Sequence, residues 1–408
     1  MLKQISILTT VAMLAPALAF AASSLIQDER WDTLVDPSID YVATYTPIEW
    51  VVGGAYRKSP KIPAGIKIDR SNNNLALGYH EGRLYFAWRT APIHFASEKA
   101  LMHIVSSRDF GQSWVHEHTI RLGRDVREPF FISYKGDLYF YYLELGKNFR
   151  KFEPRQTWVI RRQGEKQWSR PKPWGKPGEI AWEFKVRRDQ VWVSSYTGNH
   201  YSTNDSKMEV ELKVSSDGQT WTPHDLPVYR GGVSEVGFEF DEENNLWAVT
   251  RNEDGDSSGF GSHVAFADID RYWRWQIPAK SNPRRYDSPR MFRHGDDLYL
   301  IARRDVGGVF GNGWQNKLVR WYKYWRRPKR TALYRIDRQK REVVHLFDFP
   351  SAGDTSFPSI LRTGPHSYLI ANYTSPLKFP GRSWMWGQVS PQGTQIYFTT
   401  LHFAPKNK

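Results

Sequence analysis

Cysteine is absent from this chain of 408 residues. Its absence excludes a disulfide framework, thiolate catalysis and metal sites built on sulfur. The chain also lacks the motifs that mark common metal and phosphate sites, so we expect no metal and no cofactor. Beyond the N-terminal segment, no hydrophobic run is long enough for a membrane-spanning helix, which argues against stable membrane insertion. No nucleic-acid-binding motif is present, and we expect no nucleic-acid partner.

The N-terminal segment has the pattern of a secretory signal. Lys3 supplies a positive start, residues 5–20 are largely apolar, and a small-x-small sequence ends at Ala21. We therefore expect residues 1–21 to be a signal peptide that is cleaved on export to the periplasm or the medium. The remaining residues, 22–408, are expected to form a single domain.

Basic residues outnumber acidic ones, and the formal net charge is +14. An exported protein this basic is expected to meet polyanions, such as an acidic polysaccharide, lipopolysaccharide or an anionic membrane surface. We expect an acidic oligosaccharide or polysaccharide as the main partner of a monomeric protein.

Aromatic residues make up 15% of the chain, and many lie in six short strands that each follow a Gly, Asp or Asn turn. The first residues of these strands are 54, 53, 55, 52 and 70 positions apart. A period of about 40–50 residues with several strands per repeat is typical of a β-propeller. We predict an all-β, six-bladed β-propeller in which these strands are the second strands of the blades: 84–89, 138–144, 191–196, 246–251, 298–303 and 368–373.

Two further strand-like segments, Tyr41–Tyr45 and Trp50–Val52, precede the first repeat. A propeller leaves an open sheet edge unless its ends are joined. We therefore expect one of these segments to complete the last blade and close the ring.

Two turns share a serine, an aspartate, a glycine and a final tryptophan in the Asp-box pattern, at residues 107–114 and 215–221. In such a turn the aspartate accepts backbone N–H groups and the glycine takes a positive φ. The copies begin 108 residues apart, which is two repeats. With the six-fold period, this pattern resembles the sialidase superfamily of Asp-box propellers over roughly residues 70–403.

The resemblance implies a particular catalytic site. In sialidases three arginines bind the substrate carboxylate, a glutamate activates a tyrosine nucleophile, and an aspartate is the acid/base. On this pattern Glu235 opens blade four and Arg251 follows 16 residues later. Arg290 stands on the first strand of blade five, where a second clamp arginine is expected.

The chain departs from the sialidase pattern at three places. Asparagine occupies the segment Ser71–Asn74, where the first clamp arginine is expected, and Phe357 stands in place of the nucleophilic tyrosine. The loop Thr90–Glu98 contains no aspartate. The resemblance therefore implies a sialidase-like glycoside hydrolase with an altered catalytic set that acts on an acidic glycan, and we expect standard aryl sialosides to be poor substrates.

Charged residues recur at the same phase of successive repeats, where a propeller brings them to a common axis. Two carboxyl groups with separated pKa values can act as acid and base in glycoside hydrolysis, and arginines bind carboxylates in a bidentate manner. The predicted catalytic residues are Glu235, Tyr286, Asp287 and Glu144, and the predicted substrate-binding residues are Arg89, Arg251, Arg290, Arg303, His94 and Tyr201.

Two other functions remain open. A polysaccharide lyase would use a histidine or tyrosine base while arginine neutralises a uronate, and the candidate bases are His94, His200, Tyr201 and Tyr286. A non-catalytic glycan-binding propeller would retain the arginines and lack the nucleophile.

A long insertion separates the second and third strands of blade five. Residues 306–330 contain seven lysines and arginines, no acidic residue, and Trp314, Trp321 and Trp325. Long loops in compact domains often carry function. The segment is either a solvated surface loop or a functional flap, and our hypothesis is a mobile basic flap over the mouth of the axial pocket.

Overall fold

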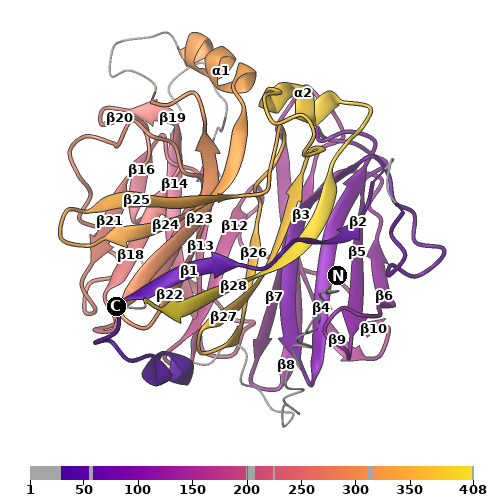
Figure 1. The fold of residues 1–408 in the computed structure, drawn as a ribbon, viewed down its shortest axis with the longest axis horizontal. Helices are drawn as coiled ribbons and strands as arrows, with labels where there is room; N and C mark the ends of the chain where they lie inside the picture. The colour runs from indigo at the N-terminus through magenta and orange to yellow at the C-terminus, as the bar shows by residue number, and fades with distance from the viewer. Residues whose placement is uncertain are drawn as a thin grey trace, which may run out of the picture.

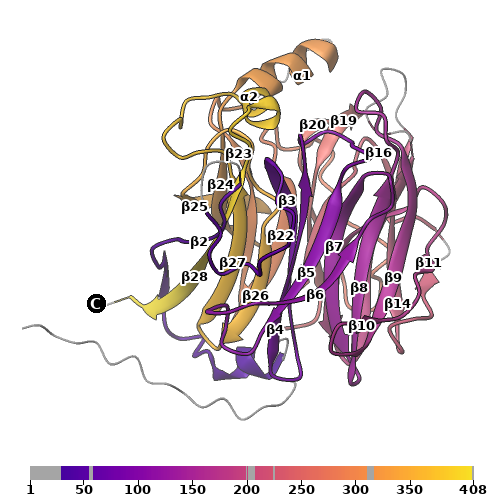
Figure 2. The same cartoon turned by 90° about the vertical axis from the view of Figure 1, so that its right-hand side faces the viewer.

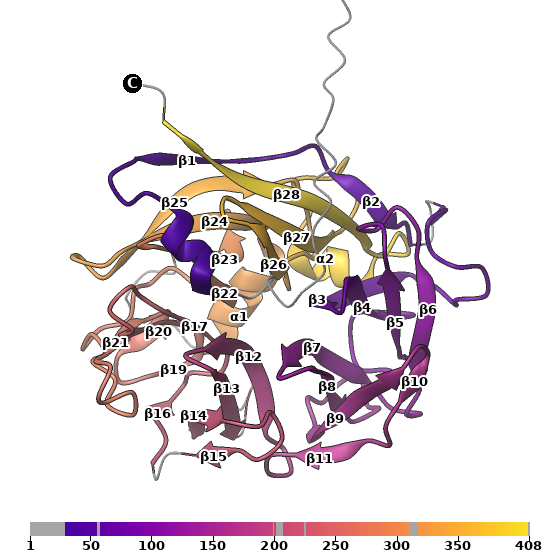
Figure 3. The ribbon, with the colours of Figure 1, turned by 90° about the horizontal axis from the view of Figure 1, so that it is seen from below.

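The computed structural model describes residues 29–54, 58–198, 200, 207–223, 226–309 and 317–406. Within these ranges the chain forms six radial blades of antiparallel strands around one axis, as the view along that axis shows (Figure 3). The predicted all-β, six-bladed β-propeller is confirmed. No helix in these ranges is both long enough and apolar enough to cross a membrane.

The strands of each blade are ordered from the axis outward. Blade one contains β3 (Ser71–His80), β4 (Arg83–Ala91), β5 (Leu101–Ser107) and β6 (Val115–Ile120). Blade two contains β7 (Val126–Tyr134), β8 (Asp137–Leu145), β9 (Pro154–Gly164), β10 (Gln167–Trp168) and β11 (Lys172–Trp174). Blade three contains β12 (Ile180–Arg187), β13 (Gln190–Gly198), β14 (Met208–Ser215), β15 (Thr222–Pro223) and β16 (Tyr229–Gly231).

The other three blades follow the same order. Blade four contains β17 (Val236–Phe240), β18 (Leu246–Thr250) and β21 (Val264–Ala267), with the hairpin β19 (Asn252–Asp256) and β20 (Gly259–Gly261) at one end. Blade five contains β22 (Asp287–His294), β23 (Asp297–Asp305), β24 (Lys329–Asp337) and β25 (Glu342–Phe349). Blade six contains β26 (Ser359–Gly364), β27 (Ser367–Thr374) and β28 (Gln395–Pro405).

The six aromatic-rich segments are the second strands of the blades, as predicted. These strands are β4, β8, β13, β18, β23 and β27, and each is paired on both sides. They are covered on both faces by the adjoining blades and are almost entirely buried. Burial on both faces explains why their sequences are nearly continuous apolar runs and do not alternate with polar residues.

N-terminal strands close the ring at blade six. Strand β1 (Tyr41–Tyr45) pairs antiparallel with β28, with Tyr41 opposite Pro405. Strand β2 (Glu49–Val52) pairs with the first half of β28. The expected closure by an N-terminal segment is therefore confirmed, and both candidate segments contribute to it.

Broad side chains fill the wedges between blades. Trp88 and Trp182 are fully buried in two of these wedges. Nearer the axis the blades approach closely, because a Cβ atom at Gly78 would lie 2.5 Å from the Cβ of Phe131 in the next blade. The axial ends of neighbouring strands are therefore held in fixed positions relative to each other.

The two turns with the Asp-box pattern lie at the outer strands of blades one and three. Asp109 accepts the N–H of Ser113 at 2.8 Å, and Gly111 has a φ of 89°. In the second turn Asp217 accepts two backbone N–H groups, and Gly218 has a φ of 73°. Both turns thus have the hydrogen bonding expected of them, and both lie away from the axis.

Helical segments lie at opposite ends of the ring. The helices α1 (Lys317–Arg326) and α2 (Trp384–Val389) lie together at one end (Figures 1 and 2). The 3-10 helix η2 (Glu29–Leu34) lies at the other end. Asp32 of η2 accepts hydrogen bonds from Arg293 and Arg362, which joins blades five and six.

Candidate functional site

The backbone is distorted at or near the starts of most of the innermost strands. Register shifts interrupt the ladders near the starts of β3, β7, β12 and β22. Four non-glycine residues in this region have a positive φ: Asn74 (48°), Glu128 (46°), Ser288 (53°) and Ser356 (70°). Positive φ is disfavoured for residues with a side chain, and such strain clusters at functional sites. The axial end beside α1 and α2 is therefore the candidate site.

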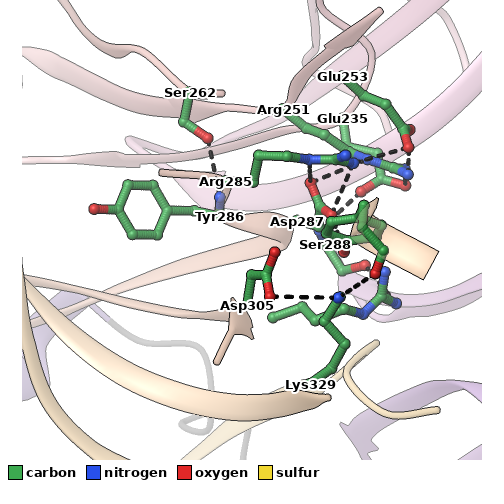
Figure 4. Close-up of polar contacts among 12 residues, drawn as sticks. Glu235, Arg251, Glu253, Ser262, Arg285, Tyr286, Asp287, Ser288, Asp305 and Lys329 are labelled. Atoms are coloured by element: carbon green, nitrogen blue, oxygen red, sulfur yellow. Dashed lines mark hydrogen bonds and ion pairs between the residues drawn. The ribbon is translucent and has the colours of Figure 1, made fainter. Parts of the chain in front are cut away.

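A buried charge cluster lies in blades four and five at this end (Figure 4). Arg251 forms ion pairs with three carboxylates, those of Glu235, Glu253 and Asp287. Arg285 adds bonds to Glu253 at 2.8 Å and to Asp287 at 3.0 Å. All five side chains are buried.

The carboxylates of this cluster differ in their affinity for protons. Burial raises the pKa of Glu235, and the nearby Arg251 offsets this only in part. Burial would also raise the pKa of Asp287, but Arg285 and Arg251 hold that pKa far below its ordinary value. The two arginines therefore favour the charged form of Asp287, whereas Glu235 is held less firmly in its charged form.

Glu128 lies on β7, the innermost strand of blade two, and is partly exposed. Its Oε1 accepts a hydrogen bond from Asn74 Nδ2 at 3.2 Å. Burial among other side chains and the charge of Glu235 raise its pKa to about 7, against the opposing effect of Arg127 and Arg290. A carboxyl group in this state holds a proton near neutral pH and can give it up to a substrate.

His94 and Asp354 form a second polar pair, where the loop after β4 meets the loop before β26. His94 Nδ1 lies 2.6 Å from Asp354 Oδ2. Tyr373 and Trp384 donate hydrogen bonds to the other carboxylate oxygen at 3.0 and 3.1 Å. Burial lowers the pKa of His94 although Asp354 opposes this shift. The ring of Phe357 lies next to the histidine, with its centroid 6.4 Å away.

The predicted clamp arginines have different surroundings. Arg89 donates hydrogen bonds to Asp125 at 2.7 Å and to the carbonyl of Phe95 at 3.0 Å. Arg303 donates to the carbonyls of Thr355 and Ser356 at 2.8 and 2.9 Å. Both arginines therefore hold the protein backbone in place.

Arg290 is the predicted clamp residue best suited to binding. Its guanidinium group lies between the rings of Phe130 and Trp182, at 4.4 and 4.5 Å from their centroids. It donates to the carbonyl of Trp182 and lies within electrostatic range of Glu128 and Glu235. Stacking fixes the plane of the guanidinium without occupying all five of its N–H donors.

Two predicted catalytic residues lie apart from the charge cluster. The ring of Tyr286 points away from the carboxylates and packs against Tyr334 between blades four and five (Figure 4). Glu144 accepts a hydrogen bond from Trp158 at 3.0 Å and pairs with Arg124. Neither residue is therefore assigned to the site.

The other predicted histidine and tyrosine bases are placed as follows. His200 Nε2 lies 3.3 Å from Glu253 at the edge of the charge cluster. Tyr201 lies outside the described residues. Within the described residues, no group of three or more potential ligands gathers to hold a metal ion.

The blade-five insertion covers the charge cluster. Tyr324 of α1 donates a hydrogen bond to Asp287, and the Arg285 guanidinium stacks on the tyrosine ring at 3.8 Å. Lys317 lies 3.5 Å from Asp254. Lys329 is fully buried, and burial lowers its pKa to about 7. Helix α1 therefore lies over the charge cluster, whereas Lys329 and Arg330 belong to strand β24. Not all cations of the segment face solvent, and its predicted mobility stays a prediction. Trp314 lies outside the described residues.

Several residues of the site were not selected from the sequence. Glu128 follows Arg127 at the start of β7, but its backbone conformation has no sequence signal. Glu253 lies two residues after Arg251, and Arg285 lies two before Asp287, a spacing that places side chains on one face of an extended chain. That spacing is the one signal that could have identified them.

Comparison with known proteins agrees with the fold. No protein-family model matches the chain, and no curated protein sequence matches it. A protein of unknown function from Dyadobacter fermentans is similar in structure, with a TM-score of 0.57 and 13% identity over 90% of this chain and 100% of that one.

Sialidase propellers are also similar. Trypanosoma rangeli sialidase in complex with the inhibitor DANA gives a TM-score of 0.54 at 13% identity, over 88% of this chain and 59% of that one. The same sialidase with 2,3-difluorosialic acid, a covalent intermediate, gives 0.50 at 12% identity over the same shares. The chain therefore has the six-bladed propeller fold with a distant similarity to sialidases.

Proposed function

We propose that this protein is an exported glycoside hydrolase that cleaves an acidic glycan at the end of the axis beneath α1 and α2. The observation that carries the proposal is Glu128: a carboxyl group on a strained bulge, with its pKa raised to about 7 and Arg290 within electrostatic range. The similarity to sialidase propellers supports a carbohydrate substrate, and the net charge of +14 supports an acidic one.

The residues have separate roles in this proposal. Glu128 donates its proton to the leaving oxygen, and Glu235 keeps that proton in place by its charge. His94 is the base: with its Nδ1–H donated to Asp354, Nε2 carries the lone pair that accepts a proton from the attacking water. Arg290 binds the acidic group of the sugar. The mechanism needs no tyrosine nucleophile, which fits Phe357 at that position.

Glu128→Gln tests the proposal. The mature protein is screened on uronate-containing polysaccharides and on sialosides, with released reducing ends and ultraviolet absorbance of unsaturated products recorded together. We expect reducing-end release to fall by about 10²–10⁴-fold in Glu128→Gln while substrate binding persists. Glu209→Gln, which alters a surface ion pair with Arg230, is the matched control. Full activity of Glu128→Gln would refute this role.

A polysaccharide lyase is the second candidate, and the His94–Asp354 pair favours it. In β-elimination His94 would remove the proton next to the uronate carboxylate, the C–O bond to the leaving group would break, and a C=C bond would form. Arg290 would stabilise the charge that develops on the carboxylate. Unsaturated product abolished by His94→Gln would support this function over hydrolysis, and binding without turnover would support a glycan-binding propeller.

A further inference from the structure

The outward face of α1 is unusually apolar for a surface helix. Leu318, Val319 and Tyr322 are 53%, 43% and 55% exposed. They follow an i, i+1, i+4 pattern, so they share one face of the helix. The opposite face, which includes Trp321 and Tyr324, is buried against the propeller. A surface helix normally presents polar residues to solvent, and exposed apolar patches mark interaction sites.

The two chain segments that contain α1 and α2 have no acidic residues. Neither residues 306–330 nor residues 376–395 contain an aspartate or a glutamate. Lys323 and Arg326 are exposed on α1, and Lys378 and Arg382 are exposed just before α2. Exposed cations therefore surround the apolar face of α1, and the nearby carboxylates Asp254 and Asp305 pair with Lys317 and Arg327.

The two helices form one continuous surface. The backbone N–H of Trp384 donates to the carbonyl of Arg327 at 3.1 Å, and the rings of Tyr324 and Trp384 meet at 5.4 Å. Both helices stand at the same extreme end of the molecule (Figures 1 and 2). We call this surface the helical crest; it consists of Leu318, Val319, Tyr322, Lys323, Arg326, Lys378, Arg382 and Val389.

We propose that the helical crest docks the protein on an anionic lipid bilayer. Cations around an exposed apolar helix face match the composition of helices that lie in the membrane interface. The aliphatic side chains favour a bilayer over an acidic polysaccharide as the partner. A hydrated polysaccharide offers no apolar medium in which Leu318 and Val319 can be buried. Acyl chains below charged headgroups satisfy both features of the surface.

Docking in this orientation would turn the axial site toward the membrane. The crest lies on the same end of the propeller as the strained residues Asn74 and Glu128, so a docked molecule would meet glycans that are attached to the lipid surface. This inference goes beyond the proposed function and does not depend on the reaction.

Flotation with lipid vesicles tests the inference. The mature protein is mixed with vesicles of phosphatidylcholine and phosphatidylglycerol or of phosphatidylcholine alone, and the bound fraction is measured. We expect binding to the anionic vesicles, and a loss of at least about tenfold in partitioning for the double variant Leu318→Gln, Val319→Gln. The double variant Lys323→Glu, Arg326→Glu should lose binding to a similar degree.

The matched control is the double variant Val344→Gln, Leu346→Gln. These residues are 38% and 39% exposed on β25, which lies away from α1 and α2 (Figure 1). We expect it to bind like the unaltered protein, and thermal unfolding shows that each variant is folded. Unchanged vesicle binding of the crest variants, or binding to an acidic polysaccharide without binding to anionic vesicles, would overturn the inference.

Discussion

Glu128 combines a left-handed backbone conformation with a carboxyl group close to the charge of Glu235. Each feature works against folding: positive φ strains the backbone, and burial disfavours the carboxylate. A hydrogen bond from Asn74 and the charges of Arg127 and Arg290 offset these costs only in part. Sites that trade stability for chemistry are expected to become more stable when the reactive group is removed.

We therefore predict that Glu128→Gln stabilises the protein in a pH-dependent way. The pKa of this carboxyl is about 7 in the folded protein against 4.5 as its ordinary value. Below pH 4.5 both states bind the proton; as the pH rises toward 7 the unfolded state releases it first, so the folded state loses stability. The advantage of Glu128→Gln should grow across this window to about 3 kcal/mol.

Urea denaturation at pH 5, 6, 7 and 8 would measure this advantage, with Glu209→Gln as the exposed control. A constant difference between Glu128→Gln and the unaltered protein over that range would contradict the prediction.

Single residues of the site could be predicted from the sequence only where strand phase determines their position. Glu235, Arg251 and Asp287 meet because they recur at equivalent points of successive repeats. Tyr286 precedes Asp287 directly, and neighbours in an extended chain face opposite sides. Only one of these two side chains can therefore reach the charge cluster. Asp287 does so, and the ring of Tyr286 packs in the hydrophobic contact between blades four and five.

Among the elements, α1 is attached to the charge cluster through Tyr324. The hydroxyl of Tyr324 donates to Asp287, a buried anion, and its ring supports Arg285. Removing the hydroxyl leaves one carboxylate oxygen without this donor and weakens the attachment of the helix to the cluster.

We predict that Tyr324→Phe destabilises the protein by about 1–3 kcal/mol, because a hydrogen bond to a buried charge is lost. Hydrogen exchange should accelerate in residues 317–330 more than in the blades. Tyr322→Phe, on the exposed face of the same helix, is the matched control. Equal exchange in both variants would show that the hydroxyl does not anchor the helix.

The strands were predictable as elements, but the helix was not. Six aromatic strands recur with turn residues before them, and burial on both faces makes each one an apolar run. The cations of α1 recur at every third position between residues 317 and 326, which is close to a helical period, but ten residues are too few to form a stable helix alone. The helical form of α1 depends on Trp321 and Tyr324 packing onto the propeller, which is a tertiary contact.

For the whole molecule, Asp32 is the residue that joins η2 to two blades. Its carboxylate accepts from Arg293 at 2.8 and 3.0 Å and from Arg362 at 2.6 Å. We predict that Asp32→Asn destabilises the fold by about 2–4 kcal/mol, because two largely buried arginines lose their counter-charge. Asp36→Asn, at an exposed position just after η2, should change little. Chemical denaturation measures both, and equal midpoints would contradict the prediction.

The pairing of β1 with β28 also determines when in folding the ring can close. Tyr41 and its partner Pro405 are separated by more than 300 residues of sequence. Until β28 has been synthesised, blade six lacks its third strand, and β1 and β2 have no partner strand to join. Contacts this distant in sequence are slow to form. The ring therefore closes late in folding, after the strands within each blade have paired with their neighbours in the sequence.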